Sequence, residues 1–177
     1  MPYGPVKRYK EKIGKGIRGG RTMGKEKGSD RKKGRTRVLF LCTGNACRSQ
    51  MAEGWAKALK SEEFEAFSAG VAPCYVHPRA IRVMQEAGVD ISGQYSKHVE
   101  ELEGIRFDYI VTLCDYAGEV CPYHPGLGKR FHRPFEDPVF ARGKEEEVLA
   151  RFRDVRDQIR RFVEGMPEIL EEPGTER

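Results

Sequence analysis

The feature that most constrains the fold is a set of short, continuously apolar segments. Val38–Leu41 reads Val-Leu-Phe-Leu and is soon followed by Gly44, and Tyr109–Leu113 reads Tyr-Ile-Val-Thr-Leu. Continuous apolar segments of this length are typical of strands buried on both faces of a parallel sheet, whereas half-exposed strands alternate in polarity. A further strand is predicted at Phe64–Ser68, closed by Gly70. These segments predict a central parallel sheet.

Segments with helical spacing separate and follow these strands. Helices are predicted from about Ser49 to Lys60 and over Arg79–Ala87, with Gly88 as a C-terminal stop. A long last helix follows Glu145–Glu147, whose carboxylates suit its positive end. One face of this helix carries Val148, Leu149, Phe152, Val155, Ile159, Phe162, Val163 and Met166. The alternation predicts a single α/β domain with a doubly wound central parallel sheet flanked by helices.

Charge separates the N-terminal part of the chain from the rest. Residues 1–36 hold 13 Lys/Arg, 3 Asp/Glu and eight glycines, a net charge of +10, whereas residues 37–177 carry −5. Such a segment buries too little apolar surface to fold, so we predict a basic, Gly-rich disordered tail at 1–36 and a folded domain at 37–172. A nucleic-acid-binding arm is the alternative function of the tail. It is less favoured, because only Tyr3 and Tyr9 are available for base stacking.

Composition excludes several classes of protein. No segment approaches the roughly 18 apolar residues of a membrane helix, and no secretory signal is evident, so we expect neither a membrane protein nor a secreted precursor. The five cysteines are too few, and odd in number, for a disulfide scaffold, which predicts a cytoplasmic protein with reduced thiols. Neither they nor the histidines have metal-ligand spacing, so no metal site is expected. The histidines are His77, His98, His124 and His132.

The first predicted strand leads directly into a Cys-x5-Arg-Ser sequence. Its residues are Cys42, Thr43, Gly44, Asn45, Ala46, Cys47, Arg48 and Ser49. Five intervening residues can curl so that successive backbone N–H groups point inward and bind a tetrahedral oxyanion, helped by the start of the following helix. The Arg48 guanidinium suits two oxygens of the anion, and Gly44 and Asn45 tolerate the positive φ of such a curl.

The same positive field makes Cys42 a candidate nucleophile. It is expected to lower the pKa of the Cys42 thiol below the usual value of about 8.5, and Ser49 is placed to donate a hydrogen bond to the thiolate. The alternative is a buried cysteine at a strand end beside a surface arginine. The order strand, loop, helix, with Gly, Asn and Ser in place, favours the catalytic interpretation.

The segment Cys42–Trp55, CTGNACRSQMAEGW, resembles the signature of the low-molecular-weight protein tyrosine phosphatase superfamily and, more narrowly, of the thioredoxin-coupled arsenate reductases. The resemblance covers about residues 37–165. It implies that Asp137, in the pair Asp137-Pro138, is the general acid that protonates the departing oxygen. Without the resemblance, this Asp-Pro pair reads only as a turn initiator.

Two further cysteines distinguish a reductase from a phosphatase. Cys114 ends the strand Tyr109–Leu113 and so falls at the same sheet edge as Cys42. Cys121 lies seven residues later; if the intervening segment is helical, the two thiols lie about 10 Å apart along its axis, too far for a disulfide without unwinding. Alternatively, both cysteines are buried packing residues.

The resemblance implies a three-cysteine relay. Arsenate binds the loop, Cys42 attacks arsenic, Cys114 attacks the adduct to release arsenite, and Cys121 attacks Cys114. The Cys114–Cys121 disulfide then takes electrons from thioredoxin, with no tightly bound cofactor. Cys47 is expected to pack passively and Cys74 to have no role. The alternative function is a low-molecular-weight phosphatase that uses Cys42, Arg48 and Asp137, and residual phosphatase activity is expected in either case.

The chain departs from the resembled family at two positions. Several relatives hold a potassium ion behind the loop through positions that match Asn45, Glu53 and Ser68, together with an aspartate. Lys97 stands at that last position. Its ammonium group is predicted either to replace the cation, so that activity does not depend on potassium, or to be a solvated surface group. The second departure is Arg133, where an aromatic residue is expected ahead of the Asp-Pro pair.

Overall fold

The computed structural model describes residues 34–120 and 128–171, without the side chains of residues 118–120. Contacts divide the chain into Met1–Lys33 and Gly34–Arg177, and the fold is that of the second unit. The predicted disorder of the tail therefore falls mainly outside the described residues, and so does Cys121.

Within the described ranges, the sheet has four parallel strands in the order β2-β1-β3-β4. These are β1 (Thr36–Cys42), β2 (Phe64–Gly70), β3 (Tyr109–Thr112) and β4 (Lys129–His132). The chain passes from β1 to β2 on one side and later returns to β3 on the other side of β1. The carboxyl ends of β1 and β3 therefore form the topological switch point, where open α/β sheets bind their ligands.

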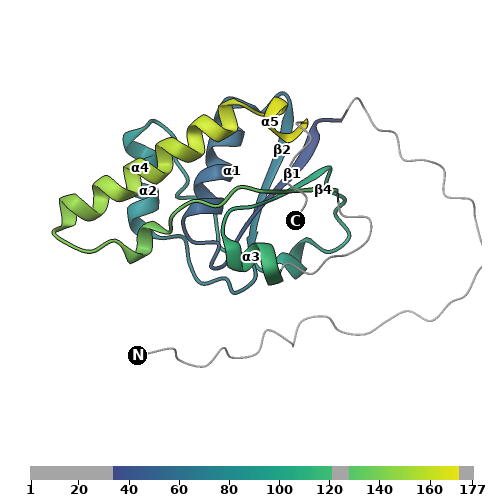
Figure 1. Cartoon of the computed structure of the whole chain (residues 1–177). Helices are drawn as coiled ribbons and strands as arrows, with labels where there is room; N and C mark the ends of the chain where they lie inside the picture. The colour runs from purple at the N-terminus through teal and green to yellow at the C-terminus, as the bar shows by residue number, and fades with distance from the viewer. Residues whose placement is uncertain (1–33, 121–127, 172–177) are drawn as a thin grey trace, which may run out of the picture. The chain divides into compact units, whose positions relative to one another are not determined.

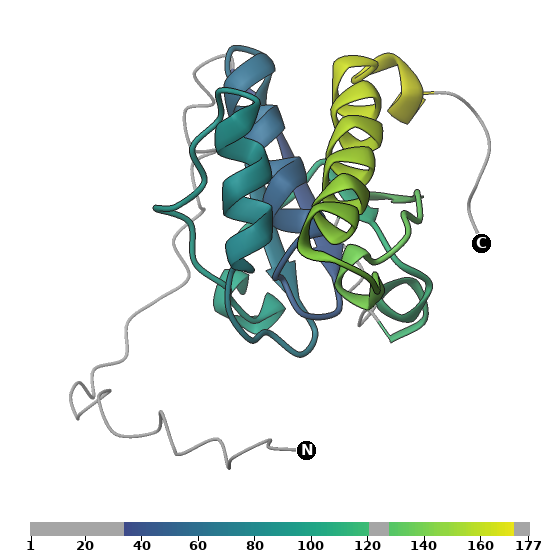
Figure 2. The ribbon, with the colours of Figure 1, turned by 90° about the vertical axis from the view of Figure 1, so that its left-hand side faces the viewer.

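In the part of the chain that the structure describes, five α-helices and two short 3₁₀ helices connect or follow these strands (Figure 1). They are α1 (Arg48–Leu59), α2 (Pro78–Glu86), α3 (Asp115–Val120), α4 (Glu145–Glu164), α5 (Glu168–Glu171), η1 (Val99–Leu102) and η2 (Pro138–Phe140). Figures 1 and 2 show α1, α2 and α4 together on one face of the sheet.

The two faces of β1 belong to two different apolar cores. Val38 and Phe40 join the larger core beneath α1, α2 and α4. Leu39 and Leu41 join a smaller one that includes Phe107 and is covered by η1 and its flanking residues. All four side chains are at most 1% exposed, which confirms that the continuous apolar segment is a strand buried on both faces.

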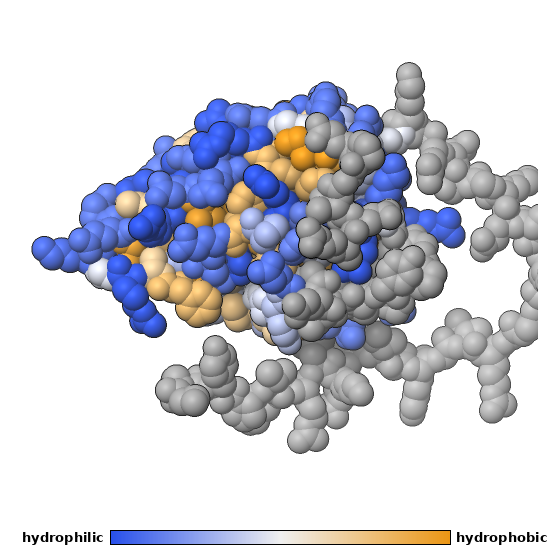
Figure 3. Space-filling model, in the orientation of Figure 1, coloured by the Kyte–Doolittle hydropathy of each residue, from blue (hydrophilic) through white to orange (hydrophobic). Residues whose placement is uncertain are grey.

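The predicted doubly wound parallel sheet is confirmed, and the predicted strands and helices lie within about two residues of the observed ones. Sequence periodicity missed β4, which reads Lys-Arg-Phe-His and is at the edge of the sheet, where a strand does not need two apolar faces. The face in Figure 3 is mainly hydrophilic with small apolar patches. Among the described residues, no helix is long and apolar enough to cross a membrane.

Candidate active site

The loop from Cys42 to Ser49 joins β1 to α1 with its carbonyl groups turned outward. N–H groups of the segment 72–77 donate to three of them: Ala72 to Thr43 at 2.9 Å, Cys74 to Gly44 at 3.1 Å and His77 to Ala46 at 2.9 Å. The Ser96 hydroxyl donates to the carbonyls of Gly44 and Asn45, each at 3.0 Å. Because the C=O and N–H of a trans peptide point in opposite directions, the N–H groups that follow these carbonyls face the loop interior. This is the arrangement of an anion-binding nest.

Asn45 fixes the curl of the loop from within. It has a φ of 45° and is fully buried, and its amide donates to the hydroxyls of Ser49 and Ser68, each at 2.9 Å. Its Oδ1 accepts from the Lys97 backbone N–H at 2.9 Å. Of the two residues expected to take a positive φ, only Asn45 does so, since Gly44 lies outside that region. A side-chain amide with all these partners holds Asn45 in the left-handed conformation.

Cys42 lies at the base of the loop and is 2% exposed. Its Sγ lies 2.9 Å from the Ser49 Oγ. Because the Asn45 amide already donates to this Oγ, the Ser49 hydroxyl hydrogen is free to point at the sulfur. The network is therefore arranged to donate a hydrogen bond to a Cys42 thiolate.

Arg48 connects the loop to the segment that carries Asp137. Its Nη2 donates to Asp137 Oδ2 at 2.5 Å, and its Nη1 donates to the Phe135 carbonyl at 3.1 Å. The Arg48 Nε is buried and has no partner among the described residues. An unpaired buried donor is unfavourable by about 1–3 kcal/mol, so this N–H is a group that an anion in the loop would satisfy.

Cys114 lies beside the same loop. Its Sγ is 3.4 Å from the Thr43 Oγ1 and accepts the Ala117 N–H at 3.4 Å, and the residue is 7% exposed. Since α3 begins at Asp115, this sulfur caps the N-terminus of the helix by accepting the Ala117 N–H. Thr43 thus links the two thiols, because it follows Cys42 in the sequence and contacts Cys114 in space.

The other two described cysteines differ from this pair. Cys47 is 3% exposed, and burial, followed by the negative charge of Asp137, raises the pKa of its thiol well above the usual value. A neutral, buried thiol suits the packing role predicted for it. Cys74 is exposed, with its Sγ 3.6 Å from the Gly44 carbonyl oxygen, so it lies against the outside of the loop.

Behind the loop, the buried Glu53 carboxylate collects several donors. The Ser68 hydroxyl donates to Oε2, the Lys57 ammonium lies 2.5 Å from Oε1, and the Lys97 ammonium lies 3.7 Å from Oε2. Lys97 is 8% exposed, and its Nζ also lies 4.7 Å from the centre of the Tyr95 ring. With two ammonium groups already on the carboxylate, these residues do not fit a potassium ion. Elsewhere in the described ranges, no group of three His, Cys, Asp or Glu could hold a metal.

Arg133 and His132 precede Asp137 at the end of β4. The Arg133 guanidinium lies 5.8 Å from the centre of the Phe135 ring, so a cation–π contact stands where an aromatic side chain was expected. His132, the last residue of β4, contacts both Thr112 and Asp115, on either side of Cys114. Sequence reasoning missed His132, because the strand that carries it has no apolar periodicity.

A buried thiol and a guanidinium in an anion-binding loop, with a carboxyl group against the guanidinium, are the arrangement of an enzyme that acts on tetrahedral oxyanions. Residues 37–174 match the low molecular weight phosphotyrosine protein phosphatase family, and the chain belongs to this family.

Known relatives divide between two activities. An arsenate reductase of Halalkalibacterium halodurans is 44% identical over 131 residues, 74% of this chain and 94% of its own length. One of Bacillus subtilis is 47% identical over 122 residues, 69% and 88% of the two chains. An arsenate reductase solved in a phosphate-binding state is 35% identical with a TM-score of 0.62, covering 74% of this chain and 95% of its own. A low molecular weight protein tyrosine phosphatase from T. tengcongensis is 28% identical with a TM-score of 0.63, covering 76% and 99%.

Proposed function

We propose that the protein reduces arsenate to arsenite, with Cys42 and Cys114 as the first two cysteines of a relay. The observation that carries this proposal is the second buried thiol, Cys114, whose Sγ lies 3.4 Å from the Thr43 Oγ1 within the oxyanion loop. A phosphatase needs one thiol at this site, whereas a reductase needs a second one to supply the other electron.

In the first step, the loop binds arsenate through its inward N–H groups and Arg48. The Cys42 thiolate attacks arsenic and a sulfur–arsenic bond forms. One oxygen leaves as water, with its proton supplied by Asp137 in its acid form. The contact between Arg48 and Asp137 supports the position of this carboxyl group, because it places the group against the side chain that binds the anion.

In the second step, the Cys114 thiolate attacks the Cys42 sulfur. The sulfur–arsenic bond breaks and its electron pair stays on arsenic, so As(V) becomes As(III) and leaves as arsenite. Two thiols are oxidised to one Cys42–Cys114 disulfide, which balances the two electrons gained by arsenic. The Ala117 N–H on the Cys114 sulfur supports the thiolate role of Cys114.

Cys121 is proposed to complete the relay, although it lies outside the described residues. It attacks Cys114, frees Cys42, and leaves a Cys114–Cys121 disulfide for thioredoxin to reduce. Because α3 spans Asp115–Val120, the helix must open for this disulfide to form. The relay starts from reduced thiols, so we place the protein in the cytoplasm.

The positive charge of Lys97 is proposed to stand in for a bound potassium ion. Lys97 is buried, its ammonium faces Glu53, and its backbone N–H holds Asn45. Lys97 thus contacts the Glu53 carboxylate through its side chain and Asn45 through its backbone.

A phosphatase is the second candidate function. Cys42, Arg48 and Asp137 meet at one site and need no other cysteine to hydrolyse a phosphate monoester. The family to which the chain belongs favours this activity as well. We expect it as a weaker side reaction of the same loop.

The deciding experiment is arsenate-dependent NADPH oxidation coupled through thioredoxin and thioredoxin reductase. Wild-type protein should turn over, and Cys114→Ser should lose turnover by at least a hundredfold while keeping aryl phosphate hydrolysis. Cys74→Ser, an exposed thiol at the same loop, is the matched control and should behave as wild type. Absence of turnover in the wild type, with brisk phosphate hydrolysis in both, would make the protein a phosphatase.

The third cysteine is tested separately. Cys121→Ser should release one arsenite per enzyme and then stop, because its Cys42–Cys114 disulfide cannot pass to thioredoxin. Undiminished steady-state turnover of this variant would exclude the relay as proposed. Removing residues 1–33, which leaves β1 from Thr36 whole, should leave turnover intact; loss of function on removing this part of the tail would instead favour the nucleic-acid-binding alternative.

A further inference from the structure

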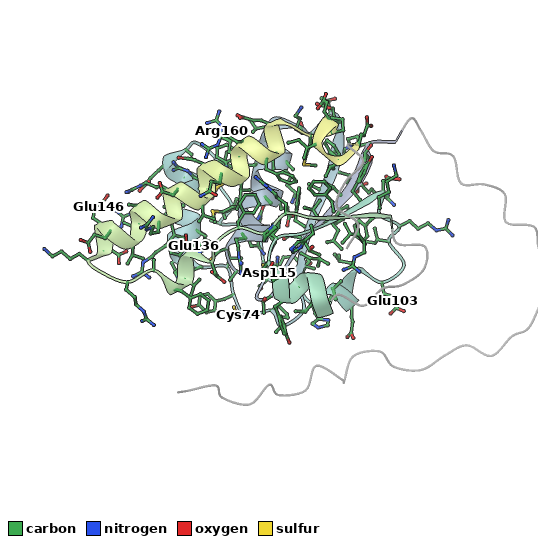
Figure 4. All side chains as sticks on the ribbon, in the orientation of Figure 1. Cys74, Glu103, Asp115, Glu136, Glu146 and Arg160 are labelled. Atoms are coloured by element: carbon green, nitrogen blue, oxygen red, sulfur yellow. The ribbon has the colours of Figure 1, made fainter. Side chains whose placement is uncertain are left out.

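His132 connects the two residues that flank the Cys114 region. Its Nδ1 lies 2.8 Å from the Thr112 Oγ1, and its Nε2 lies 3.2 Å from Asp115 Oδ1. Thr112 ends β3 and Asp115 begins α3, so the contacts join the last residue of a strand to the first residue of a helix. We call this set, Thr112–His132–Asp115, the His132 bridge. Figure 4 labels Asp115 at the start of α3.

Hydrogen-bonding rules fix the direction of these contacts. A carboxylate only accepts, so the His132 Nε2 must carry a hydrogen and donate to Asp115. In the neutral ring the Nδ1 is then an acceptor, and the Thr112 hydroxyl donates to it. The protonated ring keeps both contacts, with the hydroxyl turned to accept. The bridge therefore persists in either charge state of the histidine.

Backbone hydrogen bonds hold the residue before Cys114: the Leu113 N–H donates to the Leu41 carbonyl at 2.8 Å, and the Leu113 carbonyl accepts the Phe135 N–H at 3.1 Å. Thr112 is 2% exposed and fixed in the sheet opposite His132, whereas the Asp115 side chain is 82% exposed. Cys114 itself is held by weak sulfur contacts to Thr43 and Ala117, each at 3.4 Å. The backbone bonds thus end at Leu113, and the His132 bridge adds the side-chain tie from β4 to Asp115, the first residue of α3.

We infer that His132 is a positioning residue that holds Cys114 beside Cys42 for its attack on the arsenic adduct. The inference rests on the proposed function and adds to it a residue that touches no reacting atom. By tying Asp115 to the end of β3, the imidazole fixes the backbone turn that aims the Cys114 sulfur at the loop. Loss of the bridge lowers the fraction of molecules in which the two sulfurs are in reach.

The test uses three substitutions of His132 in a Cys121→Ser background. His132→Ala removes both contacts, His132→Asn keeps an amide near the Nδ1 position for Thr112, and His132→Gln keeps one near the Nε2 position for Asp115. Rapid-quench measurement of arsenite release in a single turnover should show a decrease of about tenfold for Ala and smaller decreases for Asn and Gln. Aryl phosphate hydrolysis, which uses Cys42 but not Cys114, should stay unchanged. Tyr116→Phe is the control, because Tyr116 is exposed and follows Asp115 in α3.

A second measurement does not depend on arsenate. The rate of Cys114 alkylation by iodoacetamide, followed by peptide mass spectrometry, should rise severalfold in His132→Ala and return toward wild type in the Asn or Gln variant. Unchanged alkylation and arsenite release in all three variants overturns the inference, and so does an equal loss of arsenite release and phosphate hydrolysis. If the wild type releases no arsenite, the proposed function fails, while the alkylation series still decides whether the bridge positions Cys114.

Discussion

The two thiols of the site are held in opposite ways. Around Cys42, N–H groups of the segment 72–77 donate to the outward carbonyls of the loop. The buried Asn45 side chain is hydrogen-bonded to Ser49, Ser68 and Lys97. Around Cys114, backbone hydrogen bonds hold the preceding Leu113, whereas the sulfur has two long contacts and the following Asp115 is held by the His132 bridge through an exposed carboxylate. The loop must present its N–H groups in a fixed geometry, which backbone hydrogen bonds provide. A thiol that forms a disulfide and then exchanges it must move, so it needs contacts that can be broken.

The largest expected effect tests whether Arg48 serves the whole site. Arg48→Lys should lower both aryl phosphate hydrolysis and arsenate reduction by at least about a hundredfold, because an ammonium cannot contact Asp137, the Phe135 carbonyl and an oxyanion together. Steady-state kinetics of both reactions provide the measurement. Arg133→Lys, at an exposed arginine against the Phe135 ring, is the matched control. A loss confined to one reaction would contradict a shared loop.

A smaller effect tests the rigidity of the loop. A Cβ at Gly70 would lie 2.7 Å from the Thr43 carbonyl oxygen and 2.9 Å from the Asn45 nitrogen, so Gly70→Ala must displace the loop backbone. We expect about a tenfold loss of kcat/KM in both reactions and a decrease of about 1–3 kcal/mol in the free energy of unfolding.

Gly93→Ala is the control, since nothing lies within 4 Å of its Cβ position. Urea denaturation and aryl phosphate kinetics measure both effects. If Gly70→Ala lowered arsenate reduction but not phosphate hydrolysis, the loop around Cys42 would tolerate the displaced backbone. It would then not be the more rigid half of the site.

The next prediction tests whether Lys97, rather than a bound potassium ion, supports the loop from behind. Wild-type turnover should be equal in KCl and NaCl, because the Lys97 ammonium already faces Glu53. Lys97→Met should lower kcat/KM by about three- to tenfold, since it leaves the buried carboxylate with less compensation. Lys57→Met removes the exposed partner of the same carboxylate and should matter less. Strong stimulation of the wild type by potassium would show that a metal ion, not Lys97, completes the support.

The sequence predicted the parts of the molecule whose residue types are dictated locally. Buried parallel strands require apolar residues at successive positions, so β1 and β3 were evident, and an anion nest after a strand requires the Cys-x5-Arg order. The roles of His132 and Lys97 depend on partners far along the chain, Thr112 for one and Glu53 for the other. Local periodicity carries no signal for such contacts. The family resemblance directed attention to Lys97, but no pattern pointed to His132.

The smallest effect concerns His77, in the segment that braces the loop. Burial, followed by the charge of Arg79, lowers the pKa of His77 below its usual value of 6.5. The unfolded chain therefore takes up a proton at this residue before the folded protein does, and stability is lost as the pH falls below about 6.5. His77→Asn should keep the cap on the Arg79 N–H but show a shallower loss of stability between pH 7.5 and 5.5. Urea midpoints at the two pH values measure this difference. An equal loss of stability in the wild type and in His77→Asn would mean that acid does not act through the segment 72–77. It would act on the Cys114 side of the site or on the surface ion pairs instead.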